Sequence, residues 1–233
     1  MNTNEKRKRQ RQLQEQRRRR NNRKQVVRRQ KIALGIVCVL AAAGLFALLR
    51  GVWNDTRHQG TFSINAACEA YRPDVEMEAA NYGMSDYVDL ILALMMQESS
   101  GRGPDVMQSS EGAYNKKYPQ VPGGITDVDY SIACGIQELK YSMEKAGVSS
   151  PTDMERIRLA LQGYNFGADV YFSYLEKNGI TAWSEQTAEA FAQSASGGNA
   201  RSQDDPLYET AGPWAYGDQK YPEHVLRYYH PSD

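Results

Sequence analysis

Apolar and polar residues are distributed differently in successive parts of this chain. Residues 1–31 are almost entirely polar, residues 32–49 form an uncharged apolar run, and residues 50–65 are polar without a clear period. From residue 66 onward, apolar positions recur at the spacing of amphipathic helices that pack on a core. The pattern therefore predicts a tail at 1–31, a hydrophobic segment at 32–49, a stalk at 50–65 and one folded domain at 66–233.

The domain is predicted to be mainly α-helical. Asp127 supplies a capping oxygen for one helix and Gly147 ends it, while the next helix begins between Ser150 and Thr152. No strand-like alternation stands out, although the segment 102–125, rich in Gly, Ser and Pro, leaves room for a small β-hairpin. The expected helices are 66–72, 75–82, 87–98, 126–146, 150–166, 169–178, 188–195 and 221–229. Buried stripes are expected at Ile132, Ile136, Leu139 and Met143, and at Ile157, Leu161 and Tyr164.

The predicted helix 87–98 ends on a carboxylate that its own pattern places toward the core. Val88, Ile91 and Met95 share one helical face, and Glu98, three residues further on, falls on the same face. The C-terminal end of a helix carries partial negative charge, and burial disfavours the charged form, so the pKa of Glu98 should be raised. Such a carboxyl suits a general acid near neutral pH. The ordinary alternative is a solvated glutamate near a helix end.

Residues 32–49 are predicted to be a transmembrane signal anchor. Eighteen uncharged residues form a helix of roughly 27 Å, which spans a bilayer with little tilt. The long basic leader and the absence of a small-residue cleavage site argue against a cleaved signal peptide. Basic flanks stay in the cytoplasm, so the domain should lie on the extracellular, cell-wall side. The alternative is a helix buried in a protein core.

The zero net charge of the chain hides two segregated halves. Fourteen of its 28 Lys and Arg residues lie within residues 1–31, whereas the part after Arg50 has a net charge of about −13. The basic tail raises the question of nucleic-acid binding, but it lacks interleaved aromatic residues. Its charge is what membrane topology and contact with anionic lipid require, so the pattern disfavours nucleic acid.

The cysteines and histidines indicate no cofactor. Cys68 and Cys134 both fall within the domain, and they are equally consistent with a disulfide and with two buried thiols. The three histidines form no cluster at ligand spacing, and no arrangement of Cys or Asp completes a metal site. We therefore predict neither a metal nor a cofactor.

Four segments of the domain stand in order over about 130 residues. They are Gln97-Glu98-Ser99-Ser100-Gly101, Asp105-Val106-Met107-Gln108-Ser109-Ser110-Glu111, Tyr130-Ser131-Ile132-Ala133-Cys134-Gly135-Ile136-Gln137-Glu138-Leu139 and Gln162-Gly163-Tyr164-Asn165-Phe166-Gly167, with a closing segment at 221–229. Together they resemble the lysozyme-like superfamily of goose-type lysozymes and soluble lytic transglycosylases, and most closely the CwlT-like lysozymes of Gram-positive bacteria. Val106 stands where Pro is usual, and Gly163 where Ala is usual; both changes are conservative in size.

The resemblance implies a glycosidase that acts on the glycan strands of peptidoglycan, between N-acetylmuramic acid and N-acetylglucosamine. Glu98 would be the catalytic acid, and Glu111 or Asp105 a second carboxylate, with Glu111 favoured. An inverting muramidase needs that second group to activate water, whereas a lytic transglycosylase needs none because the muramyl 6-hydroxyl attacks. The residues expected to contact or position substrate are Ser99, Asp105, Gln108, Tyr164 and Asn165.

Two further functions are open from the sequence alone. The fold could serve a non-catalytic scaffold in wall binding or cell division, although a pure binder has no need of a carboxyl at a helix end. It could also serve as a wall-opening accessory of a conjugation or secretion machine, for which the sequence names no protein partner.

Overall fold

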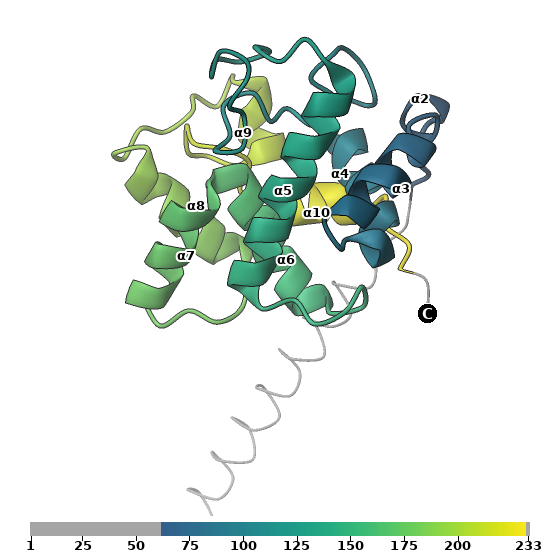
Figure 1. Ribbon diagram of the computed structural model, residues 1–233. Coiled ribbons are helices and arrows are strands. Elements are labelled where there is room, and N and C mark those ends of the chain that lie inside the picture. Colours follow the sequence, from purple (N-terminus) through teal and green to yellow (C-terminus); the bar gives the residue numbers. More distant parts are fainter. Residues whose placement is uncertain (1–61, 232–233) are drawn as a thin grey trace, which may run out of the picture. The chain divides into compact units, whose positions relative to one another are not determined.

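The computed structural model describes residues 62–231, and within this range every regular element is a helix (Figure 1). The predicted tail, the apolar segment 32–49 and most of the stalk lie outside the described residues. No helix within 62–231 is long and apolar enough to cross a membrane. The elements are α2 (Ala66–Glu69), α3 (Arg72–Asn81), the 3₁₀ turn η1 (Ser85–Tyr87), α4 (Val88–Glu98), α5 (Val128–Ala146), α6 (Met154–Phe166), α7 (Ala168–Lys177), α8 (Glu185–Ala195), α9 (Pro206–Ala211) and α10 (Tyr221–Leu226).

The domain is built around helix α4, which is buried on all sides over most of its length. The side chains of α4 from Leu90 to Met95 are all 0% exposed. The single stripe predicted through Val88, Ile91 and Met95 is therefore too narrow, and Val88 itself is only partly buried. Helices α2, α3 and α10 pack against α4. A helix that is apolar all round has to be enclosed in this way.

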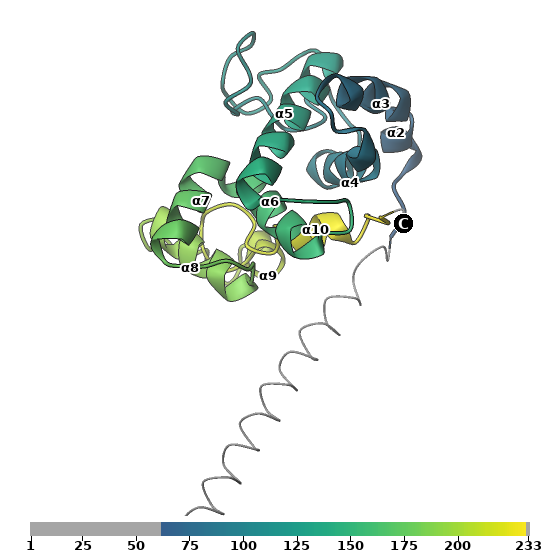
Figure 2. The same ribbon diagram turned by 60° about the horizontal axis from the view of Figure 1, so that its bottom comes forward.

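The two longest helices, α5 and α6, pack on each other between two groups of shorter helices. Helices α2, α3 and α4 lie on one side and α7, α8 and α9 on the other, with α5, α6 and α10 between them (Figure 2). The predicted stripe of α5 is buried as expected, including Ile132 at 1% exposure and Leu139 at 0%. Asp127 caps the start of α5, and Gly147 ends it in the left-handed region with φ 72°. This agrees with the capping signals in the sequence.

The packing of α6 on α5 explains why the chain has Gly163. A Cβ at this position would lie 2.5 Å from Oγ of Ser142 and 2.7 Å from the ring of Phe172. The Ser142 hydroxyl donates a hydrogen bond to the carbonyl oxygen of Ala160 at 2.6 Å. The neighbours of Gly163 thus fill the space of a methyl group, so an alanine here is less conservative than its size alone suggests.

Several element boundaries differ from those predicted. Helix α6 begins after Asp153, whose side chain caps it, and neither Ser150 nor Thr152 is the cap. Helix α8 begins at Glu185 after its cap Ser184, three residues before the predicted start. The helix α9 was not predicted. The segment 102–125 contains no strand, so the small β-hairpin is absent, and the one β-bridge in the described range joins Ala200 and Trp214.

Candidate active site

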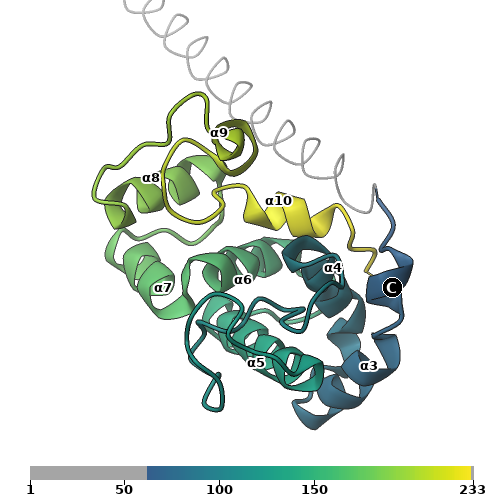
Figure 3. The ribbon, with the colours of Figure 1, turned by 90° about the horizontal axis from the view of Figure 1, so that it is seen from above.

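Glu98 is the last residue of α4, and its carboxyl meets the first residue of α10. The hydroxyl of Tyr221 donates a hydrogen bond to Oε1 of Glu98. Tyr221 is 2% exposed, while Glu98 is partly buried. Figure 3 shows α10 lying beside α4 and α6, which is the packing that brings these two side chains together.

The environment of Glu98 favours its protonated form. Burial raises the pKa of Glu98 from its ordinary 4.5 to about 7, and the nearby charges of Asp105 and Asp218 raise it as well. The hydrogen bond from Tyr221 acts in the opposite direction, because it stabilises the charged carboxylate. Burial is the largest of these effects. The geometry thus provides a carboxylic acid that still holds its proton near neutral pH.

Tyr164 connects this carboxyl to the loop that follows α4. Its ring stacks on the ring of Tyr221, with centroids 6.5 Å apart and planes 15° from parallel. Its hydroxyl donates to the carbonyl oxygen of Met107 at 2.8 Å. Burial, followed by the charge of Glu98, raises the pKa of Tyr164 well above its ordinary value, so the hydroxyl stays protonated and remains a donor.

The loop after α4 is fixed by Asp105 and Ser99. The carboxylate of Asp105 accepts from the amides of Ser109 and Ser110 and from the hydroxyl of Ser131 at 2.7 Å, and it is 3% exposed. The hydroxyl of Ser99 donates to the carbonyl oxygen of Val106 at 2.7 Å. Both side chains are engaged within the protein, so this geometry lends no support to the prediction that they contact substrate.

Gly135 of α5 lets the same loop approach the helix closely. A Cβ at Gly135 would lie 2.5 Å from Cβ of Met107, which no ordinary packing allows. The amide of Met107 in turn donates to the hydroxyl of Ser131 at 3.1 Å. Gly135, in the third motif, therefore allows the loop that contains the second motif to pack directly against α5.

A cleft of about 730 Å³ lies beside Tyr164 and collects several of the predicted residues. It is bounded by the loop 108–114, by α5 and by the junction of α6 with α7. Gln108, Glu111, Tyr164 and Asn165 all line it, whereas Glu98, Ser99 and Asp105 do not. Tyr164 lines the cleft and stacks on Tyr221, which in turn donates to Glu98.

Three of the polar residues that line the cleft are held to different degrees. Gln108 is exposed, adopts a left-handed φ of 48° and donates from Nε2 to the carbonyl oxygen of Asp105 at 2.8 Å. The side-chain oxygen of Asn165 accepts from the amide of Asp218 at 2.8 Å, so Asn165 helps to hold the segment before α10. Glu111 is exposed. Gln108 and Glu111 are therefore both exposed to solvent.

Sequence reasoning missed three residues of the site. Tyr221 contacts Glu98 from a position 123 residues away. Asp218 raises the pKa of Glu98 and pairs with Nδ1 of His224 at 2.6 Å. Glu138 lines the cleft from α5. The sequence does draw attention to Tyr221, because this residue begins the closing segment at 221–229. No local pattern, however, indicates that Tyr221 contacts Glu98.

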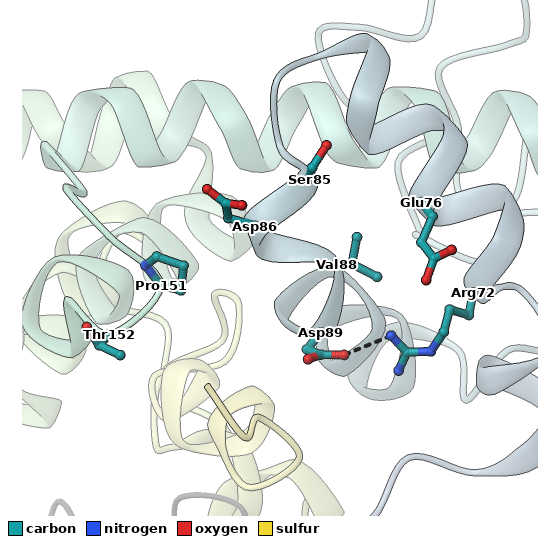
Figure 4. Close-up of a pocket in the computed structure, with 8 residues that line it drawn as sticks. All are labelled: Arg72, Glu76, Ser85, Asp86, Val88, Asp89, Pro151 and Thr152. Atoms are coloured by element: carbon teal, nitrogen blue, oxygen red, sulfur yellow. Dashed lines mark hydrogen bonds and ion pairs between the residues drawn. The ribbon is translucent and has the colours of Figure 1, made fainter. Parts of the chain in front are cut away.

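A second hollow lies away from these residues, between α3, η1 and the segment before α6 (Figure 4). It is lined by the side chains of Arg72, Glu76, Asp86 and Asp89, among others, and by none of the motif residues. The guanidinium of Arg72 is engaged by the carboxylate of Asp89 at 2.9 Å. This hollow lacks the chemistry of the Glu98 site.

The two cysteines of the domain are free thiols. Cys68 and Cys134 are both buried and unpaired. The sequence was consistent with a disulfide and with two buried thiols, and the structure contains the two thiols. Within residues 62–231, no group of three or more His, Cys, Asp or Glu side chains is arranged to hold a metal ion.

The chain belongs to the lysozyme-like family, whose model matches residues 66–229. It is 35% identical over 174 residues to the bifunctional muramidase/DL-endopeptidase CwlT of Bacillus subtilis, covering 74% of this chain and 45% of that protein. It is 35% identical over 162 residues to the uncharacterized membrane protein YocA of the same organism, covering 66% of this chain and 65% of YocA. The chain therefore spans about half to two thirds of the length of these relatives.

The fold is also similar to that of a solved structure. A crystal structure of a protein of the NLP/P60 family, described as similar to lipoprotein and taken from Staphylococcus aureus, superposes with a TM-score of 0.57 at 30% identity. The match covers 74% of this chain and 55% of the other. The predicted class, a mainly helical lysozyme-like domain, is confirmed for the described residues.

The raised pKa of Glu98 predicts a pH-dependent gain of stability in Glu98→Gln. Folding favours protonated Glu98, so the wild type loses this contribution as the pH rises from 4.5 through about 7, whereas the amide cannot ionise. The two proteins should be equally stable below pH 4.5. Above about pH 7, the free energy of unfolding of the variant should be greater than that of the wild type by at most about 3 kcal/mol.

Urea unfolding at a series of pH values measures this difference. The matched control is Glu144→Gln, because the side chain of Glu144 is 62% exposed on α5 and does not line the cleft. A difference between wild type and Glu98→Gln that stays constant with pH would contradict the assigned environment.

Proposed function

We propose that this protein is a membrane-anchored peptidoglycan glycosidase that cleaves the bond between N-acetylmuramic acid and N-acetylglucosamine, with Glu98 as the general acid. The observation that carries the proposal is the partly buried Glu98 carboxyl, whose pKa of about 7 leaves it a proton to donate. The relative CwlT, which is named a muramidase, supports the substrate class. Residues 32–49 would anchor the chain with its domain on the cell-wall side, and the printed name of YocA as a membrane protein agrees with this.

In the proposed reaction, Glu98 protonates the glycosidic oxygen while positive charge develops on the sugar ring. Tyr221 keeps the Glu98 carboxyl in place and stabilises the carboxylate that remains after proton transfer. To Gln108 and Tyr164, which line the cleft, we assign the role of orienting the sugar. After bond cleavage, Glu98 regains its proton from solvent in the muramidase mechanism, or from the attacking 6-hydroxyl in the transglycosylase mechanism.

The second half of the reaction distinguishes two mechanisms. For a muramidase, we assign Glu111 as the base that activates water, since it is exposed in the cleft while Asp105 is buried. The alternative is a lytic transglycosylase, in which the muramyl 6-hydroxyl attacks and Glu111 has no chemical role. The alternative of another class is a non-catalytic scaffold in division or conjugation, for which the acid at Glu98 would have no use.

Replacing Glu98 by Gln should reduce the digestion of purified peptidoglycan by about 100- to 10,000-fold, because general acid catalysis is lost while the hydrogen-bond acceptor for Tyr221 remains. The assay uses the full chain in detergent and measures the release of soluble glycan. Glu144→Gln should keep wild-type activity. Equal digestion by Glu98→Gln and wild type would exclude the proposed catalysis, and inactivity of all three proteins would favour the scaffold.

The products should carry reducing ends, as those of a muramidase do, and Glu111→Gln should lower their rate of formation. The reason is that water, activated by a carboxylate on the opposite face of the sugar, then completes the reaction. Mass spectrometry of the digested glycan separates the two mechanisms. Products with 1,6-anhydromuramic ends, formed equally fast by Glu111→Gln, would instead establish the transglycosylase.

A further inference from the structure

Glu138 is a cleft residue that the proposed reaction does not use. It extends from the middle of α5 and lines the cleft together with Glu111 and Tyr164. Its Oε1 accepts the backbone N–H of Tyr114 at 3.2 Å. The backbone N–H of Ala113 also interacts favourably with this carboxylate. The principal partners of Glu138 are therefore amides of the turn that immediately follows Glu111.

The turn lies directly against this carboxylate. A Cβ on Gly112 would be 2.3 Å from Oε1 of Glu138 and 2.9 Å from its Cδ. A larger residue at this position would require the Glu138 carboxylate to move. The amide of Gly112 donates to the carbonyl oxygen of Ser109 at 3.1 Å, which closes the turn on its other side. Glu111 is thus an exposed residue that directly precedes the backbone held from α5.

The position of Glu138 is costly for folding. Burial is the largest effect on the pKa of Glu138 and raises it, while the amides of Tyr114 and Ala113 lower it. Because folding favours the protonated form, ionised Glu138 makes the folded state less stable at neutral pH than an uncharged side chain of the same shape would. The amides of Tyr114 and Ala113 offset part of the cost of burying this carboxylate.

We propose that Glu138 is a positioning residue that holds the turn Gly112–Tyr114 against α5 and thereby keeps the Glu111 carboxylate at the cleft. The proposal rests on the proposed function, in which Glu111 acts on the attacking water. Oε1 of Glu138 accepts the backbone N–H of Tyr114, and this hydrogen bond joins the turn to α5. Loss of this acceptor displaces Glu111 from the reacting sugar, and small displacements of this kind have large effects on rate.

The experiment compares Glu138→Ala and Glu138→Gln, each alone and combined with Glu111→Gln, in the full chain. Glu138→Ala should lower kcat by about tenfold to a hundredfold with little change in KM. Glu138→Gln should retain most of the activity, because its amide oxygen still accepts an N–H. The double variant Glu111→Gln/Glu138→Ala should be no slower than Glu111→Gln alone, since Glu138 acts only through Glu111.

A second measurement, independent of turnover, is hydrogen exchange at the amides of Ala113 and Tyr114. Exchange should accelerate in Glu138→Ala, and it should stay near the wild-type rate in Glu138→Gln and in the control Glu144→Ala, which changes an exposed residue of the same helix. This measurement reports on the turn even in a protein without activity.

The outcomes that would overturn the inference are distinct from failure of the proposed function. Wild-type activity in Glu138→Ala or in Glu111→Gln would overturn it, as would equal loss in Glu138→Gln and Glu138→Ala, or additive losses in the double variant. Unchanged exchange at Tyr114 in Glu138→Ala would also overturn it. Failure of the proposed function would appear instead as full activity of Glu98→Gln.

Discussion

The hydrogen bond from Tyr221 to Glu98 joins the start of the last helix to the end of the most buried one. A carboxyl at the C-terminal end of an apolar helix faces the helix dipole and a poorly solvating environment, and both disfavour its charge. The partner of the Glu98 carboxyl is the neutral hydroxyl of Tyr221. A cation at this position would instead have kept the carboxyl ionised. The neutral partner leaves the pKa of Glu98 raised to about 7, which suits a group that must release a proton.

Most residues of the sequence motifs hold the segments around this contact in place. Asp105 and Ser99 fix the loop after α4 through bonds to backbone groups and hydroxyls, and Gly135 gives that loop room against α5. Asn165 holds the segment that leads into Tyr221. The motif residues therefore divide into those that build the frame and those, such as Gln108, that reach the cleft. Buried polar networks of this kind are stable only when every member is satisfied.

Much of the fold could be predicted from the sequence, because helix periods and caps are local. Gly147 and Asp127 bound α5 as their chemistry requires. The six-residue α9 has too few residues to show a period, and it was missed. In the candidate site, the partly buried position of Glu98 follows from one helical pattern. Its contact with Tyr221 depends on tertiary packing across 123 residues, which no local pattern encodes. The same limit hid Glu138, whose partners are backbone amides of a distant turn.

The central claim is that Glu98 is an acid held protonated near neutral pH by burial. The most direct test is a carbon-13 NMR titration of the Glu98 carboxyl, with Tyr221→Phe as the comparison. We expect a pKa of about 7 in the wild type and a higher one in the variant, since the hydrogen bond from Tyr221 lowers it. A Glu98 that titrates near 4.5 and is unaffected by Tyr221→Phe would contradict the account.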